Sequence, residues 1–145
     1  MAEKKKILFL CTGNACRSQM AEGWARCLKG DLIEPYSAGV MAAGPSQKTV
    51  DVMAEAGVDI SSQRSKSYEE YLGQTFDCVV ILCGNVYRMN PKFPEALQTV
   101  HIPFDDPPAL KYTADTPEEV IDIYRRVRDE IRDFVERLPE ALEHL

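Results

Sequence analysis

The chain has 145 residues, the size of one ordinary domain, and 45% of them are hydrophobic, enough to fill a core without disulfide bonds. Its formal net charge of -6 argues against a protein that binds nucleic acid or an anionic membrane through a general positive field. No apolar run approaches the roughly 18 residues of a membrane span, and the apolar run near the N-terminus is too short for a signal peptide. We therefore expect a single domain over 1–145 that acts as a monomer in the cytoplasm, without nucleic-acid or membrane partners.

Short apolar runs predict four strands, at 7–10, 32–37, 78–82 and 99–102. The first run is continuously apolar and ends in a turn, which is typical of a strand that is buried on both faces of a sheet. The third run, CVVIL, is the most β-like run in the chain.

Three segments carry apolar side chains at the spacing of an amphipathic helix, namely 18–28, 46–56 and 117–138. A short helical piece is expected at 68–72, and the proline-rich stretch 104–117 is the one long loop that we predict. Strands that alternate with helices favour parallel pairing through right-handed crossovers. We therefore predict an α/β fold, a three-layer sandwich with a four-stranded parallel sheet.

The sequence CTGNACRS, residues 11–18, lies between the first predicted strand and the first predicted helix. In a parallel sheet, ligands bind at this place, where strands end and helices begin. The Cys-x5-Arg spacing lets successive backbone N–H groups converge on one centre, and Gly13 and Asn14 both tolerate a positive φ. Arg17 offers a planar fork for two oxygens of a tetrahedral oxyanion. The predicted oxyanion-binding residues are Thr12, Gly13, Asn14, Ala15, Cys16, Arg17 and Ser18.

Cys11 is the predicted nucleophile, because it lies below the centre on which these donors converge. The N–H groups, the positive end of the helix dipole and the guanidinium all favour a thiolate over a thiol. Ser18 can add a hydrogen bond to the sulfur. The alternative is an inert cysteine in a tight turn between a strand and a helix.

Two further residues are expected at the same edge of the sheet. Attack on an oxyanion needs a proton donor for the leaving oxygen, and Asp106, just after the fourth predicted strand, is the candidate. Aspartates before proline also occur simply as turn residues, and the sequence leaves open whether Asp105 shares the role. Cys83 directly follows the third predicted strand, so its thiol can attack a sulfur on Cys11. A structural cysteine at a strand end is the alternative for Cys83.

The five cysteines are odd in number and include no CxxC pair, which argues against both a disulfide framework and a metal site. Cys16, inside the loop, either forms a protective disulfide with Cys11 or only fills space. Cys27 and Cys78 are expected in the core, together with Trp24.

The stretch CTGNACRSQMAEGW, residues 11–24, resembles the signature of the arsenate reductases built on the low-molecular-weight protein tyrosine phosphatase fold. The resemblance extends to YSAG at 36–39, VVILC at 79–83, FDDP at 104–107 and YRRVRDEI at 124–131. It therefore covers nearly the whole chain.

The resemblance implies that Cys11 attacks arsenate, Arg17 holds its oxygens and Asp106 protonates the leaving hydroxide. Cys83 would then attack Cys11, which releases arsenite and leaves a Cys11–Cys83 disulfide. No flavin, haem or metal cofactor is implied, because the thiols supply both electrons. An external thiol or a redoxin would restore them, and the biological outcome would be arsenic detoxification.

The main alternative is a phosphatase that hydrolyses phosphate monoesters through a phosphocysteine intermediate. Phosphatases of this superfamily usually have proline where Gln19 stands, and an aromatic residue where Pro108 and Ala109 stand. These differences favour the reductase, while a non-catalytic anion sensor is a third possibility.

The resemblance leaves the reductant open. Thioredoxin-coupled reductases carry a third cysteine seven positions after the second, where this chain has Asn90. Either an outside reductant such as thioredoxin or glutaredoxin reaches the Cys11–Cys83 disulfide directly, or a small thiol such as glutathione or mycothiol attacks the arsenylated Cys11.

Some members of the family hold a potassium ion. Asn14, Glu22 and Ser37 match its ligands, but Lys66 stands where an acidic residue would be. The Lys66 ammonium is a candidate replacement for the ion, so we predict no metal in this chain.

Overall fold

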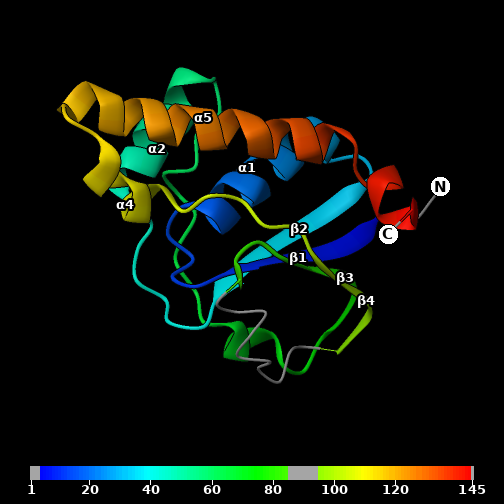
Figure 1. Cartoon of the computed structure of the whole chain (residues 1–145). Coiled ribbons are helices and arrows are strands. Elements are labelled where there is room, and N and C mark those ends of the chain that lie inside the picture. The colour runs from blue at the N-terminus through cyan, green and yellow to red at the C-terminus, as the bar shows by residue number, and fades with distance from the viewer. Residues whose placement is uncertain (1–3, 85–94, 145) are drawn as a thin grey trace.

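The computed structural model describes residues 4–84 and 95–144. Its centre is a four-stranded sheet made of β1 (Lys5–Cys11), β2 (Ile33–Gly39), β3 (Thr75–Ile81) and β4 (Glu95–His101). The strands lie in the order β2-β1-β3-β4, and every neighbouring pair is parallel (Figure 1). The predicted parallel sheet is therefore confirmed, although each strand begins or ends a few residues outside its predicted run.

The burial of each strand follows its place in the sheet. Ile7, Leu8, Phe9 and Leu10 of the central strand β1 are all fully buried, as their continuous apolar run predicts. The edge strand β4 is exposed at every second residue near its start, and the side chain of Leu97 is 81% exposed. Because only one face of β4 is covered, its first residues lack the apolar run by which the other strands were predicted.

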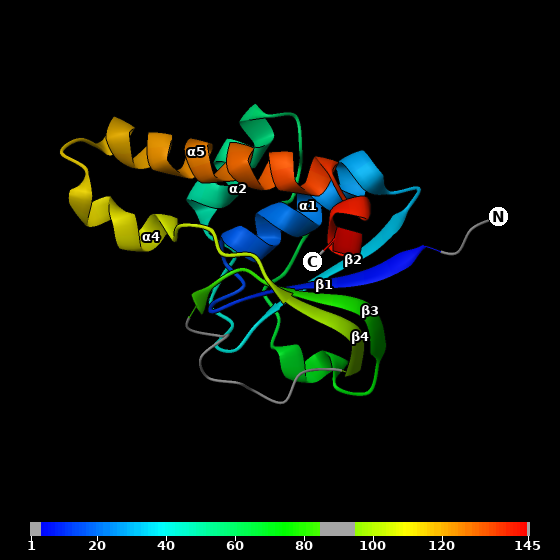
Figure 2. The same cartoon turned by 45° about the vertical axis from the view of Figure 1, so that its right-hand side comes forward.

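Helices lie on both sides of the sheet. In both views α1 (Arg17–Lys29), α2 (Gln47–Glu55) and α5 (Pro117–Glu136) cover one face, while the short helix η1 (Tyr68–Tyr71) lies below the other (Figures 1 and 2). The three predicted layers are therefore present, and the third contains the short helix η1. The short helix η3 (Glu140–His144) follows α5 near the C-terminus.

The core lies between the sheet and the pair α1 and α5. Trp24 of α1 is buried as predicted, and its indole N–H donates to the carbonyl oxygen of Arg128 in α5 at 3.1 Å. On the opposite face, Tyr71 of η1 packs edge-on against Tyr36 of β2 and Phe76 of β3. These contacts fix η1 beneath β2, close to the segment that carries Lys66.

Two predictions are wrong in detail. The stretch 104–117 is not one long loop, because it contains the helices α4 (Pro107–Leu110) and η2 (Lys111–Thr113). Proline lacks an N–H group, which the first turn of a helix does not need, so the two prolines begin α4 instead of excluding it. Cys27 is exposed on the last turns of α1 and does not belong to the core, whereas Cys78 is buried as expected.

No helix in the described ranges is both long enough and apolar enough to span a membrane. Asn90 falls outside the described residues. The prediction of a single domain over 1–145 stays a prediction.

Candidate active site

The predicted oxyanion-binding residues form the connection between the last residue of β1 and the first residue of α1. A pocket of about 200 Å³ opens there, and Cys11, Arg17 and Asp106 all contribute to its wall. The sheet thus brings together the predicted nucleophile, the predicted anion-binding guanidinium and the predicted acid. The other lining residues are Thr12, Gly13, Ala15, Cys16 and Pro108.

Asn14 and Ser18 do not line this pocket, although both were predicted to contact the anion. They are fully buried behind the loop, where their side chains support Cys11. The amide Nδ2 of Asn14 donates to the Ser18 hydroxyl at 2.7 Å, and that hydroxyl lies 2.9 Å from the Cys11 sulfur. Because the hydroxyl oxygen already accepts from Asn14, its own proton is available to the sulfur. Such a donor stabilises a thiolate more than a neutral thiol.

Asn14 adopts a positive φ of 50°, which few residues other than glycine tolerate. Of the two loop residues that tolerate a positive φ, Asn14 adopts it and Gly13 does not. Three hydrogen bonds of the Asn14 side chain stabilise the turn: one to Ser18, one from the backbone N–H of Lys66 at 2.8 Å and one from Gln19 at 3.1 Å.

Gly39, the last residue of β2, lets the loop approach the sheet closely. A Cβ atom at this position would lie 2.7 Å from both the backbone nitrogen of Asn14 and the carbonyl oxygen of Thr12, nearer than packing permits. Backbone N–H groups of Met41 and Ala43, just after β2, donate to the Thr12 and Gly13 carbonyls. The YSAG motif was recognised only by resemblance, and this geometry supplies its physical reason.

Arg17 joins the anion loop to the segment that carries the predicted acid. Only 7% of this residue is exposed, and its Nη1 donates to the carbonyl oxygen of Phe104 at 3.1 Å. Its Nη2 lies 3.7 Å from Oδ2 of Asp106. The neighbouring Asp105 points to a different partner, Arg126 of α5, at 3.1 Å. Asp106, not Asp105, therefore lines the pocket.

Cys83 lies beside the loop, just after β3. The thiol is buried and its sulfur is 3.3 Å from the hydroxyl of Thr12, the residue next to Cys11. All five cysteines are reduced in the structure. The prediction that Cys83 and Cys11 meet at one sheet edge therefore agrees with the placement of Cys83 against the loop.

The environment of the Cys16 thiol is not that of a reactive cysteine. Burial is the main cause that raises the pKa of Cys16, and the nearby Cys11 raises it further. Its thiol consequently stays protonated at neutral pH. This environment fits a residue that shapes the loop and does not compete with Cys11 for the substrate.

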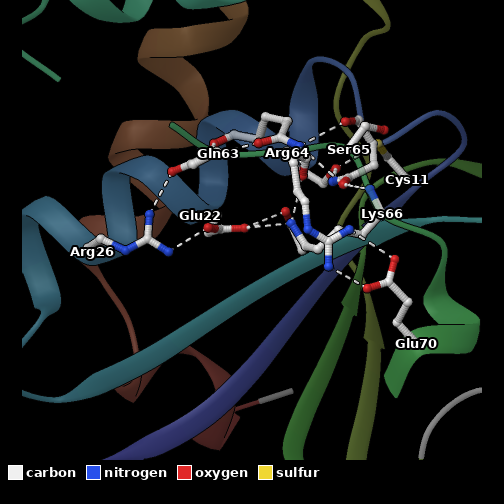
Figure 3. Close-up of polar contacts among 12 residues, drawn as sticks. Cys11, Glu22, Arg26, Gln63, Arg64, Ser65, Lys66 and Glu70 are labelled. Carbon is white, nitrogen blue, oxygen red and sulfur yellow. Dashed lines mark hydrogen bonds and ion pairs between the residues drawn. The ribbon is translucent and has the colours of Figure 1, made fainter. Parts of the chain in front are cut away.

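The described residues contain no group of three or more His, Cys, Asp or Glu side chains placed to hold a metal ion. Of the potassium ligands that the resemblance implies, Glu22 and Ser37 contact each other, and the Lys66 ammonium lies beside Glu22 (Figure 3).

Lys66 and Gly39 matter to the site because of contacts with residues that are distant in the chain. Resemblance to the family pointed to both residues, but no local pattern in the sequence predicts these contacts.

Residues 6–144 match the family model of the low molecular weight phosphotyrosine protein phosphatases. The chain belongs to this family. Among its relatives are an arsenate reductase of Halalkalibacterium halodurans, 45% identical over 95% of this chain and 97% of that protein, and an arsenate reductase of Bacillus subtilis, 43% identical over 96% and 98%.

Solved structures of the phosphatase family agree with this assignment. An arsenate reductase in its phosphate-binding state has a TM-score of 0.76 at 30% identity, covering 92% of this chain and 95% of that one. A low molecular weight protein tyrosine phosphatase from T. tengcongensis has a TM-score of 0.71 at 30% identity, covering 95% and 99%. The family thus includes both kinds of enzyme that the sequence left as alternatives.

Proposed function

We propose that this chain is an arsenate reductase in which Cys11 attacks arsenate and Cys83 resolves the product. The placement of Cys83 carries the proposal, because its buried sulfur lies 3.3 Å from Thr12 in the anion loop. Reduction by the protein's own thiols needs a second thiol near Cys11, whereas hydrolysis of a phosphate ester does not. The relatives named arsenate reductase at 45% and 43% identity support the same conclusion.

In the first step the Cys11 thiolate attacks arsenic, and Arg17 together with the loop N–H groups binds the remaining oxygens. An arsenic–oxygen bond breaks, and Asp106 donates a proton so that the oxygen leaves as water. The product is an arsenate group bonded to the Cys11 sulfur, with arsenic still in the +5 state. The Ser18 hydroxyl donates a hydrogen bond to the sulfur when Cys11 is a thiolate.

In the second step the Cys83 thiolate attacks the Cys11 sulfur. A sulfur–sulfur bond forms and the sulfur–arsenic bond breaks, so its electron pair passes to arsenic. Arsenic falls from +5 to +3 and leaves as arsenite, while two thiols become a disulfide. The two electrons come entirely from the protein, which is why we propose that no metal or organic cofactor takes part.

The disulfide must then be reduced from outside. The position seven residues after Cys83 is Asn90, so no third cysteine at that place can carry the disulfide away from the loop. We propose that the reductant, a thioredoxin, a glutaredoxin or a small thiol such as glutathione or mycothiol, attacks the Cys11–Cys83 disulfide itself. The monomeric state and the cytoplasmic location stay predictions.

Single-turnover stoichiometry tests the reductase. Reduced protein is mixed with excess arsenate without any other reductant, and arsenite and free thiols are counted. We expect one arsenite per chain and the loss of two thiols, with Cys83→Ser producing no arsenite. Cys27→Ser, at the exposed cysteine on α1, is the matched control and should behave like wild type. Full arsenite release by Cys83→Ser would refute the role of Cys83.

The second candidate is a phosphatase that works through a phosphocysteine, which the family and the T. tengcongensis structure favour. Cys11, Arg17 and Asp106 would serve both reactions. Hydrolysis of p-nitrophenyl phosphate should require Cys11 but be insensitive to Cys83→Ser. If wild type hydrolyses this ester efficiently and forms no arsenite with a redoxin or a small thiol, the phosphatase is the correct assignment.

A further inference from the structure

A buried carboxylate lies directly behind the anion loop and faces two cations. Glu22 is only 5% exposed, and its Oε1 accepts a hydrogen bond from the Ser37 hydroxyl at 2.5 Å. Its Oε2 accepts from Nη2 of Arg26 at 2.5 Å, and the Lys66 ammonium lies 3.6 Å from Oε1 (Figure 3). One negative charge is therefore balanced by two positive ones.

Lys66 connects this carboxylate to the loop. The residue is 8% exposed, and its ammonium donates to the carbonyl oxygen of Arg64 at 2.8 Å as well as facing Glu22. Its backbone N–H donates to Oδ1 of Asn14, the loop residue with positive φ. Asn14 in turn donates to Ser18, whose hydroxyl contacts the Cys11 sulfur. The position of Lys66 is thus linked to the reacting thiol by an unbroken series of hydrogen bonds.

Dissolved ions can reach the region around Glu22. A hollow of about 410 Å³ opens beside it, and Glu22, Arg26, Arg64 and Lys66 all contribute to its wall. A dissolved cation that entered would find the Glu22 carboxylate already paired with two positive charges, those of Arg26 and Lys66, which would repel it. Asn14 is one of the residues that the resemblance assigns to potassium, and its Oδ1 already accepts two hydrogen bonds. The residues present therefore do not fit a bound potassium ion.

We propose that Lys66 supplies from within the chain the positive charge that fixes Glu22 and the anion loop, so that oxyanion binding is independent of dissolved monovalent cations. The proposal holds whether the loop serves arsenate reduction or ester hydrolysis.

The test compares melting temperature and the affinity for inorganic phosphate in potassium chloride, sodium chloride and choline chloride at equal ionic strength. Wild type should give the same two values in all three salts. Lys66→Met should bind phosphate about tenfold more weakly, which corresponds to ~1.4 kcal/mol. Lys66→Asp replaces the ammonium with a carboxylate. This variant should have a higher melting temperature and bind phosphate more tightly in potassium chloride than in choline chloride.

Lys48, an exposed lysine on α2, provides matched controls with the same changes of charge. Lys48→Met and Lys48→Asp should bind phosphate like wild type in every salt. Tighter phosphate binding by wild type in potassium than in choline would overturn the proposal, and this comparison decides the question even if the Lys66 variants fail to fold. Equal affinities of Lys66→Met and Lys48→Met, or a Lys66→Asp indifferent to potassium, would also overturn it.

Discussion

Replacing Ser18 with alanine removes a hydroxyl that lies 2.9 Å from the Cys11 sulfur. Ser18 does not line the pocket, so the change leaves the residues of the pocket wall in place. A hydrogen bond to a charged partner contributes about 1.5–3 kcal/mol. If that energy is lost from the attacking thiolate, the rate of arsenite formation in a single turnover should fall roughly 10- to 150-fold. The same change leaves the buried Nδ2 of Asn14 without its acceptor, so the melting temperature should also fall.

Ser65→Ala separates these two effects. The Ser65 hydroxyl donates to the carbonyl oxygen of Gly13 at 3.0 Å, so its loss weakens the support of the loop without touching the sulfur. Alkylation of Cys11 by iodoacetamide at neutral pH, measured with mass spectrometry, follows the thiolate directly. We expect slow alkylation only in Ser18→Ala. Equal alkylation and arsenite rates in the two variants would show that the Ser18 hydroxyl does not stabilise the thiolate.

Three further predictions concern the same region and the core. Gly39→Ala places a Cβ atom 2.7 Å from Asn14 and Thr12 backbone atoms, so phosphate affinity measured by calorimetry should fall at least about tenfold (~1.4 kcal/mol), whereas Gly73→Ala, with open space around it, should match wild type. Arg126→Ala loses an exposed ion pair with Asp105, worth about 0–1 kcal/mol, and should slow arsenate reduction no more than about fivefold, far less than Asp106→Asn; an equal loss would mean that Arg126 is needed to place the acid. Burial raises the pKa of Cys78 to about 12 from 9.0, so its thiol adds stability below pH 9.0 that is lost as pH rises toward 12; Cys78→Val should flatten the fall of the melting temperature over that interval, and an unchanged slope would refute the assignment.

The sequence by itself determined which reactive side chains lie at the edge of the sheet. Cys11 and Arg17 lie within one short motif, and the apolar run of β1 followed by the helical pattern of α1 fixes how that motif is presented. Parallel strands end at the same edge, so Asp106 and Cys83 could be assigned to the pocket region from their positions just after β4 and β3. These inferences succeeded because each depends on local periodicity and on one general rule of topology.

Only the tertiary structure decided how the loop is held. Lys66 reaches Asn14 across 52 positions of the chain, and Gly39 matters because the backbone of the loop passes over it. The sequence pattern likewise did not predict that Cys27 of α1 is exposed, or that the proline-rich stretch contains the helix α4. Contacts between residues distant in the chain leave no local periodicity, because they depend on which faces meet once the sheet and helices have packed.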